Sequence, residues 1–122
     1  VLLMYAEACN ELGESREALD KLEMVRARAR RTVHPADMTV GLPEITETGK
    51  EKLREIIWNE RRIELALEGH RFFDLIRADK MVPGYAEKMM KAHGKTNFSI
   101  AKHATFFIPQ KQVDISQGVL KN

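Results

Sequence analysis

The sequence predicts a mainly α-helical fold, in which a helical hairpin packs on a long helix and the C-terminal segment is irregular. Apolar residues recur at helical spacing over most of the first 30 residues, and again from about residue 50 to residue 69. Glycines end these periodic stretches, and a segment containing Pro and Gly separates them. From Phe98 onward the periodicity is lost, so we expect an irregular end to the chain.

Composition places the chain among globular proteins. It has 122 residues, of which 43% are hydrophobic and 31% are charged, and we expect residues 1–122 to form one domain. The 20 basic and 18 acidic residues leave a net charge of +2, which argues against a dedicated nucleic-acid binder. Cys9 is the only cysteine, which excludes an internal disulfide and a cysteine-based zinc site. We expect no cofactor.

The first two helices are expected to form a hairpin from about Val1 to Arg30. Gly13 ends the first helix, and Ser15 is a plausible N-cap for the second. So short a connection requires antiparallel packing, and the hairpin resembles a tetratricopeptide repeat. The expected apolar positions are Leu2, Tyr5, Ala6, Cys9 and Leu12 in the first helix, and Ala18, Leu19, Leu22, Val25 and Ala29 in the second.

A loop and a long third helix should follow. Residues 32–48 contain Pro35, Gly41 and Pro43 and show no sustained period, which is typical of a loop. Thr48 followed by Glu51 is a capping-box pattern, so the third helix should run from about Gly49 to about Gly69. Its expected apolar positions are Leu53, Ile56, Ile57, Ile63 and Leu67, with Trp58 and Leu65 on its other side.

The remaining elements are shorter. A helix is expected over His70 to Arg77, and Pro83-Gly84 predicts a turn. Another short helix is expected from Tyr85 to His93, ended by Gly94. Thr105 to Ile108 is expected to form a short strand-like piece that ends at Pro109.

The most specific feature is the run NERRIELALEGHRFFDLIR at residues 59–77. It resembles the signature segment near the C-terminus of SusD/RagB proteins. Residues 2–29 and the Phe107-Ile108-Pro109-Gln110 segment resemble other parts of that family, in the same order. Several features depart from the pattern: Phe107 stands where the family usually has a proline, Gln112 stands where an acidic residue is common, and residues 80–103 match nothing in it.

The resemblance implies a non-catalytic nutrient-binding lipoprotein, exposed on the cell surface at the outer membrane. Such proteins bind glycans or other nutrients and cap a SusC-like TonB-dependent outer-membrane transporter. The chain would be the C-terminal helical portion of such a protein, lipid-anchored through a missing N-terminus, with its ligand site mostly upstream of Val1. The alternative is a tetratricopeptide-type scaffold for protein interactions.

Glu60 and Glu64 are the most tempting catalytic residues, because paired carboxylates can hydrolyse glycosidic bonds. Their helical face is the apolar one, however, so both are expected to point toward the core. Buried carboxylates require cationic partners, and the chain offers Arg26, Arg28, Arg61 and Arg71. We therefore expect structural ion pairs and no catalytic residue.

Other polar groups also favour structural roles. His70 and Asp74 have the i, i+4 spacing of metal ligands, but the other histidines, His34, His93 and His103, lie in unrelated contexts. We expect no metal site, and we count Asp74 among the ion-pair candidates. The arginines at positions 26, 28, 30 and 31 fall at a helix C-terminus, where the dipole favours cations.

The aromatic residues show no convincing sugar platform. They are Trp58, Tyr5, Tyr85 and five Phe, and most occupy apolar helical positions. We expect Tyr85 alone to be exposed. Because one ring gives little contact area, the isolated chain should bind glycans weakly or not at all.

Overall fold

The computed structural model describes residues 1–33 and 42–121, which form two compact units, Val1–Glu68 and Gly69–Asn122. The mainly α-helical fold is confirmed. The helices among the described residues are α1 (Leu2–Leu12), α2 (Ser15–Val33), α3 (Lys50–Glu64), α4 (Arg71–Met81), α5 (Tyr85–Ala92), α6 (Ile100–His103) and α7 (Gln110–Ile115). The strand-like piece predicted at residues 105–108 is wrong, because no strand occurs in the described part of the chain. None of the described helices has the length and apolar content needed to cross a bilayer.

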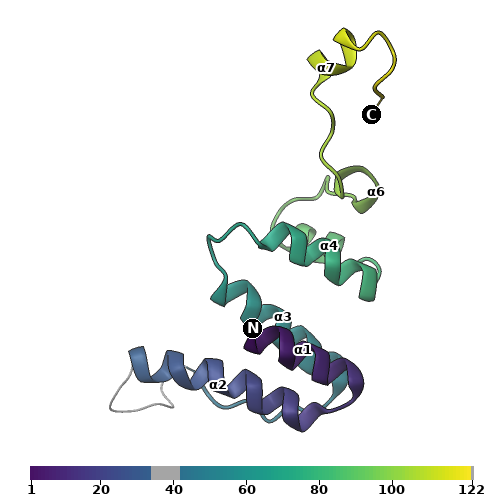
Figure 1. Ribbon diagram of the computed structural model, residues 1–122. Coiled ribbons are helices and arrows are strands. Elements are labelled where there is room, and N and C mark those ends of the chain that lie inside the picture. The colour runs from purple at the N-terminus through teal and green to yellow at the C-terminus, as the bar shows by residue number, and fades with distance from the viewer. Residues whose placement is uncertain (34–41, 122) are drawn as a thin grey trace. The chain divides into compact units, whose positions relative to one another are not determined.

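The predicted hairpin is confirmed: α1 lies beside α2 and α3 in the first unit (Figure 1). Gly13 follows α1 with φ 87°, a left-handed conformation that lets the chain reverse at once. The N–H groups of Gly13 and Glu14 satisfy the carbonyls of Asn10 and Cys9. Ser15 is the first residue of α2 and not its N-cap, since the chain is helical from that residue.

Three helices share one apolar core. Ala6 and Ala18 are fully buried, and these small side chains let α1 and α2 approach closely. The buried core consists of Leu3, Ala6, Cys9, Ala18, Leu22, Val25, Leu53 and Ile57. Tyr5 and Leu12 were expected in this core but are 49% and 77% exposed, because they lie at the edge of the buried stripe of α1.

The third helix begins where predicted but ends earlier. Gly49 is its N-cap and no side-chain cap bond forms, so the predicted capping box is wrong. The helix ends at Glu64 and does not reach Gly69, because the turn that follows contains Leu67 at φ 68°. Ile63 is 54% exposed and Leu67 is fully exposed, so both were wrongly assigned to the core.

The predicted loop is only partly described. Its first residues continue α2 as far as Val33, and residues 34–41, which include Pro35 and Gly41, lie outside the described part of the chain. Residues 42–49 are irregular up to the start of α3. Ile45 packs against the core of the first unit, so this segment is fixed to the helices that it connects.

In the second unit α4 packs on α5. Gly84, at φ 86°, makes the predicted Pro83-Gly84 turn between them. The short helices α6 and α7 were not predicted, because 4 and 6 residues are too few to show a clear period. The expectation that Tyr85 is exposed is wrong: Tyr85 is the first residue of α5 and is only 8% exposed.

Candidate functional site

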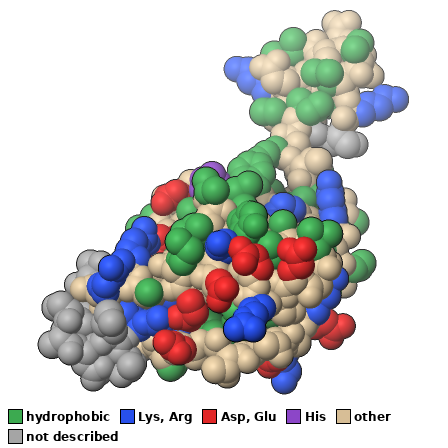
Figure 2. Space-filling model, turned by 60° about the horizontal axis from the view of Figure 1, so that its bottom comes forward, with side chains coloured by type: hydrophobic (Ala, Val, Ile, Leu, Met, Phe, Trp, Pro, Cys, Tyr) green, Lys and Arg blue, Asp and Glu red, His purple; other side chains and the backbone are tan. Residues whose placement is uncertain are grey.

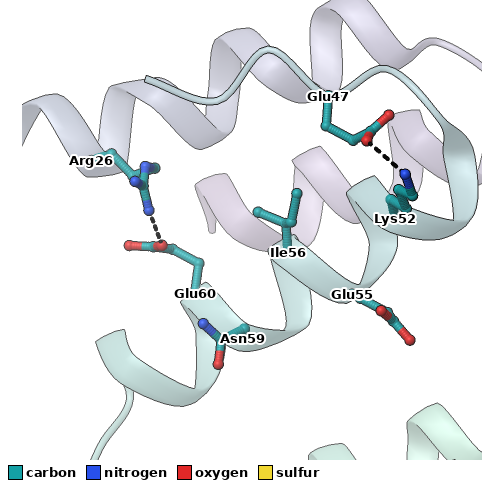
Figure 3. A pocket seen from close by; sticks show the side chains of 7 residues that line it. All are labelled: Arg26, Glu47, Lys52, Glu55, Ile56, Asn59 and Glu60. Atoms are coloured by element: carbon teal, nitrogen blue, oxygen red, sulfur yellow. Dashed lines mark hydrogen bonds and ion pairs between the residues drawn. The ribbon is translucent and has the colours of Figure 1, made fainter. Parts of the chain in front are cut away.

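A charged hollow of about 450 Å³ lies in the first unit. It is formed by α3, by Arg26 of α2 and by Glu47 in the segment before α3. We call it the α3 hollow, and its lining is Arg26, Glu47, Lys52, Glu55, Ile56, Asn59 and Glu60. Figure 3 shows Arg26 and Glu60 pointing toward each other at one end and Glu47 and Lys52 at the other. The hollow therefore has an ion pair at each end, with Ile56 between them.

Glu60 is a buried carboxylate with a defined cationic partner. It lies on the same helical face as Leu53 and Ile57, which explains why it is only 5% exposed. Arg26 donates from Nη1 to Glu60 Oε2 at 2.8 Å, and from Nη2 to the carbonyl of Pro43 at 2.8 Å. One guanidinium thus links α2, α3 and the segment between them.

A second arginine one turn later on α2 repeats this pattern. Arg30 forms an ion pair with Glu23 and donates to the carbonyl of Leu42 at 3.0 Å. Glu23 also accepts a hydrogen bond from the backbone N–H of Ile45 at 3.3 Å. Arg26 and Arg30 are both buried and hydrogen-bond the backbone of the segment that follows α2, so they do not form a basic surface.

Glu64 forms an ion pair with Arg28, the next arginine along α2 after Arg26. The two carboxylates therefore engage two arginines of α2, an arrangement that matches a structural clamp better than a hydrolytic pair. A glycosidase needs both carboxyl groups free to act on the substrate, whereas each of these carboxylates forms an ion pair with its own arginine. The roles of Arg61 and Arg71 as ion-pair partners stay predictions.

A polar seam between α1 and α3 was not predicted. Trp58 Nε1 donates to Glu7 Oε1 at 2.8 Å, and Asn10 Nδ2 donates to the carbonyl of Lys50 at 2.9 Å. Glu7 and Asn10 are both buried. Positions 3, 7 and 10 share one helical face, and this spacing is the signal that could have placed these residues beside the core.

Glu11 and Arg54 extend this seam. Arg54 donates from Nε and Nη2 to the two carboxylate oxygens of Glu11, at 2.6 and 2.7 Å. These bonds to Arg54 are the main reason that the pKa of Glu11 lies below its ordinary value of 4.5, and the charge of Lys50 lowers this pKa further. The bidentate geometry is the kind that contributes most to an ion pair.

The structure does not bring a metal-ligand set together in the part that it describes. No group of three or more His, Cys, Asp or Glu side chains gathers among the described residues, and His34 lies outside them. Asp74 Oδ1 lies 3.5 Å from Arg77 Nη2, so Asp74 forms an ion pair with a residue one turn later in the same helix.

On the face seen in Figure 2, basic and acidic side chains are interspersed.

The signature run at residues 59–77 covers the end of α3, the turn that follows it and the first part of α4. A profile described as the SusD family matches residues 1–122, the whole chain. The chain belongs to the SusD family. The resemblance seen in the sequence is thus confirmed, and this match does not favour an unrelated tetratricopeptide scaffold.

Curated SusD-like proteins are similar to this chain over most of its length. SusD-like protein P38 of Formosa agariphila is 37% identical over 83 residues, which are 67% of this chain and 16% of that protein. SusD-like protein P2 of the same organism is 41% identical over 81 residues, 63% of this chain and 15% of the relative. The chain thus matches about one sixth of the length of these relatives. No solved structure gives a significant match.

Proposed function

We propose that this SusD-family chain is the C-terminal helical portion of a non-catalytic glycan-binding protein at the cell surface. In this proposal the protein is lipid-anchored in the outer membrane and delivers its ligand to a SusC-like TonB-dependent transporter. The observation that carries the proposal is the family match over all 122 residues, with the signature run at its centre. The relatives, both named SusD-like proteins, support the same assignment.

Within that protein, the first unit would serve as a rigid scaffold. Its buried arginines tie residues 42–45 to α2 and α3 through backbone carbonyls, and its α1–α3 seam adds a bidentate ion pair. Interactions of this kind fix one arrangement of helices more strictly than apolar packing alone. A scaffold of this kind is suited to hold a ligand site or a transporter contact formed by other parts of the protein.

Binding is tested with the protein expressed from its complete gene, applied to an array of polysaccharides and oligosaccharides. The proposal predicts retention of at least one glycan, with the sugar recovered unchanged after long incubation. A sugar that is shortened or rearranged by the protein would contradict the non-catalytic part. Retention of no glycan would contradict the binding part.

The partner and the location are tested in the native membrane. A tagged copy of the complete protein, extracted in mild detergent, should co-purify with a TonB-dependent outer-membrane transporter and should incorporate labelled fatty acid. Recovery of the complete protein in the cytosolic fraction, without lipid and without a transporter, would contradict this part of the proposal.

A further inference from the structure

The second unit has a hollow of its own, lined by residues between Met90 and His103. The sequence alone showed no family motif at residues 80–103, although the SusD family profile covers them. The volume of this hollow is about 320 Å³, at the small end of the range found for ligand pockets. It lies where α5 ends and α6 begins, and its apolar lining includes Met90 and Phe98. A space of this size accommodates about one sugar ring.

One wall of this hollow is a pair of stacked rings. Phe98 and His103 have centroids 5.5 Å apart and an interplanar angle of 24°. His103 Nδ1 lies 3.1 Å from the backbone nitrogen of Ser99 and 3.0 Å from its carbonyl oxygen, so the Ser99 backbone holds that edge of the ring. Nε2 is the ring atom that remains for a ligand, as a donor in one tautomer and an acceptor in the other.

The rest of the lining is polar and carries positive charge. Lys95, Thr96 and Asn97 contribute an ammonium, a hydroxyl and an amide, and all three residues are exposed. No carboxylate occurs among the described residues that line the hollow. The nearby Glu87 accepts a hydrogen bond from the backbone N–H of Ile100, outside the lining. An anionic ligand therefore meets a cation and no opposing charge in the lining.

The geometry points to a binding subsite for one anionic sugar residue, formed by Lys95, Asn97, Phe98 and His103. The apolar C–H face of the sugar would lie against the aromatic wall, its hydroxyl groups would meet Asn97 and His103, and its carboxylate or sulfate would pair with Lys95. This inference rests on the proposed role in glycan binding. It adds to the proposed function the position of one sugar contact and the charge of the sugar bound there.

The test uses the 122-residue chain labelled with nitrogen-15, titrated separately with glucuronate, glucose and acetate. Glucuronate should shift the amide signals of residues 94–98 and 103, with a Kd on the order of millimolar, as expected for a small ligand with few contacts. Glucose should bind roughly ten-fold more weakly, because it lacks the charge-assisted hydrogen bond to Lys95. Acetate should cause smaller shifts, because it carries the charge without the ring.

Two variants at matched positions separate a site from a general charge effect. K95Q should weaken glucuronate binding roughly ten-fold and leave glucose binding unchanged. K102Q removes the same charge from an exposed position in α6 outside the lining. It should change glucuronate binding less than about two-fold, because Lys102 has no place in the proposed contact and acts only through screened solvent.

The ring wall is tested by F98L, which should weaken both sugars, and by H103Q in its place if the F98L spectrum loses its dispersion. The inference is overturned if glucuronate leaves residues 94–103 unshifted, if acetate binds as well as glucuronate, or if K102Q acts like K95Q. Retention of a polysaccharide by the complete protein is measured separately. That result tests the proposed function, while the titration tests this subsite.

Discussion

Arg26 shows how a single side chain can hold three parts of the first unit together. Its two Nη atoms reach Glu60 of α3 and the carbonyl of Pro43, and its Nε lies 3.4 Å from Glu23 in its own helix. Little solvent reaches the Arg26–Glu60 pair, whose side chains are 10% and 7% exposed. An isolated charge left at such a site is costly, and the cost appears when one partner is removed.

Glu60→Gln should therefore lower the free energy of unfolding by about 3 kcal/mol, the lower end of the range for breaking a buried pair. The lower end applies because Glu23 still lies near Arg26 in the variant. Urea unfolding measures the change. Glu55→Gln, at an exposed position of the same helix and hollow, is the matched control and should cost less than about 1 kcal/mol. Equal effects in the two variants would show that burial of the pair contributes nothing.

Glu11 gives the first unit a dependence on pH. Its pKa is lowered in the folded state, chiefly by hydrogen bonds from Arg54, so its contribution to stability is present above the ordinary pKa of 4.5. That contribution is lost as the pH falls through the lower folded value. The stability difference between the wild type and Glu11→Gln should thus be largest near neutral pH and should shrink below about pH 4.5. Unfolding at several pH values, with Arg54→Gln as a second background, measures it.

In the Arg54→Gln background, Glu11→Gln should produce a smaller difference at neutral pH, because the hydrogen bonds that lower the pKa are gone. A difference that stays constant from pH 7 to pH 3 would contradict the assignment.

Glu60 could be singled out from the sequence, whereas the buried polar residues of α1 could not. The carboxylates at positions 60 and 64 stood out because they interrupt an apolar stripe and four arginines were available. Glu7 and Asn10 are equally buried, but their partners lie 51 and 40 residues away along the chain. Spacing along one helix predicts which face a residue occupies, and only the packed structure shows what that face meets.

At the scale of elements, the reversal between α1 and α2 depends on Gly13. Its φ of 87° is strained for any residue with a Cβ, although the space around it is open. Gly13→Ala should therefore lower the free energy of unfolding by about 1 kcal/mol through the backbone alone. Thermal unfolding measures the loss. Leu12→Ala, at a 77% exposed neighbour, is the control and should change stability by less than about 0.5 kcal/mol. No loss in Gly13→Ala would mean that the turn adopts another conformation.

The ends of helices were predictable where a periodic stretch is followed directly by a glycine that closes the helix, as at Gly13 and Gly94. The end of α3 was not, because Leu65 and Leu67 extend the apolar pattern into a turn. The aromatic residues were also misjudged: Tyr85 is buried, whereas Phe73 and Phe106 are 63% and 83% exposed. Periodicity shows which face of a helix carries the apolar residues. Whether that face is buried depends on whether another element packs against it.

In the molecule as a whole, the SusD family profile covers the entire chain, and the chain forms two compact units. The first is joined by buried ion pairs that suit a scaffold, and the second carries a small hollow that suits one sugar residue. The subsite proposed for one sugar residue would give a long glycan few contacts. Most of the binding free energy of the complete protein should thus come from residues outside this chain.

Calorimetric titration of the chain and of the complete protein with the same retained glycan tests this account most directly. The complete protein should bind at least about ten-fold more tightly than the chain, and the chain should bind with a Kd no lower than about millimolar. Equal affinities would contradict it, because they would place the whole ligand site within these 122 residues.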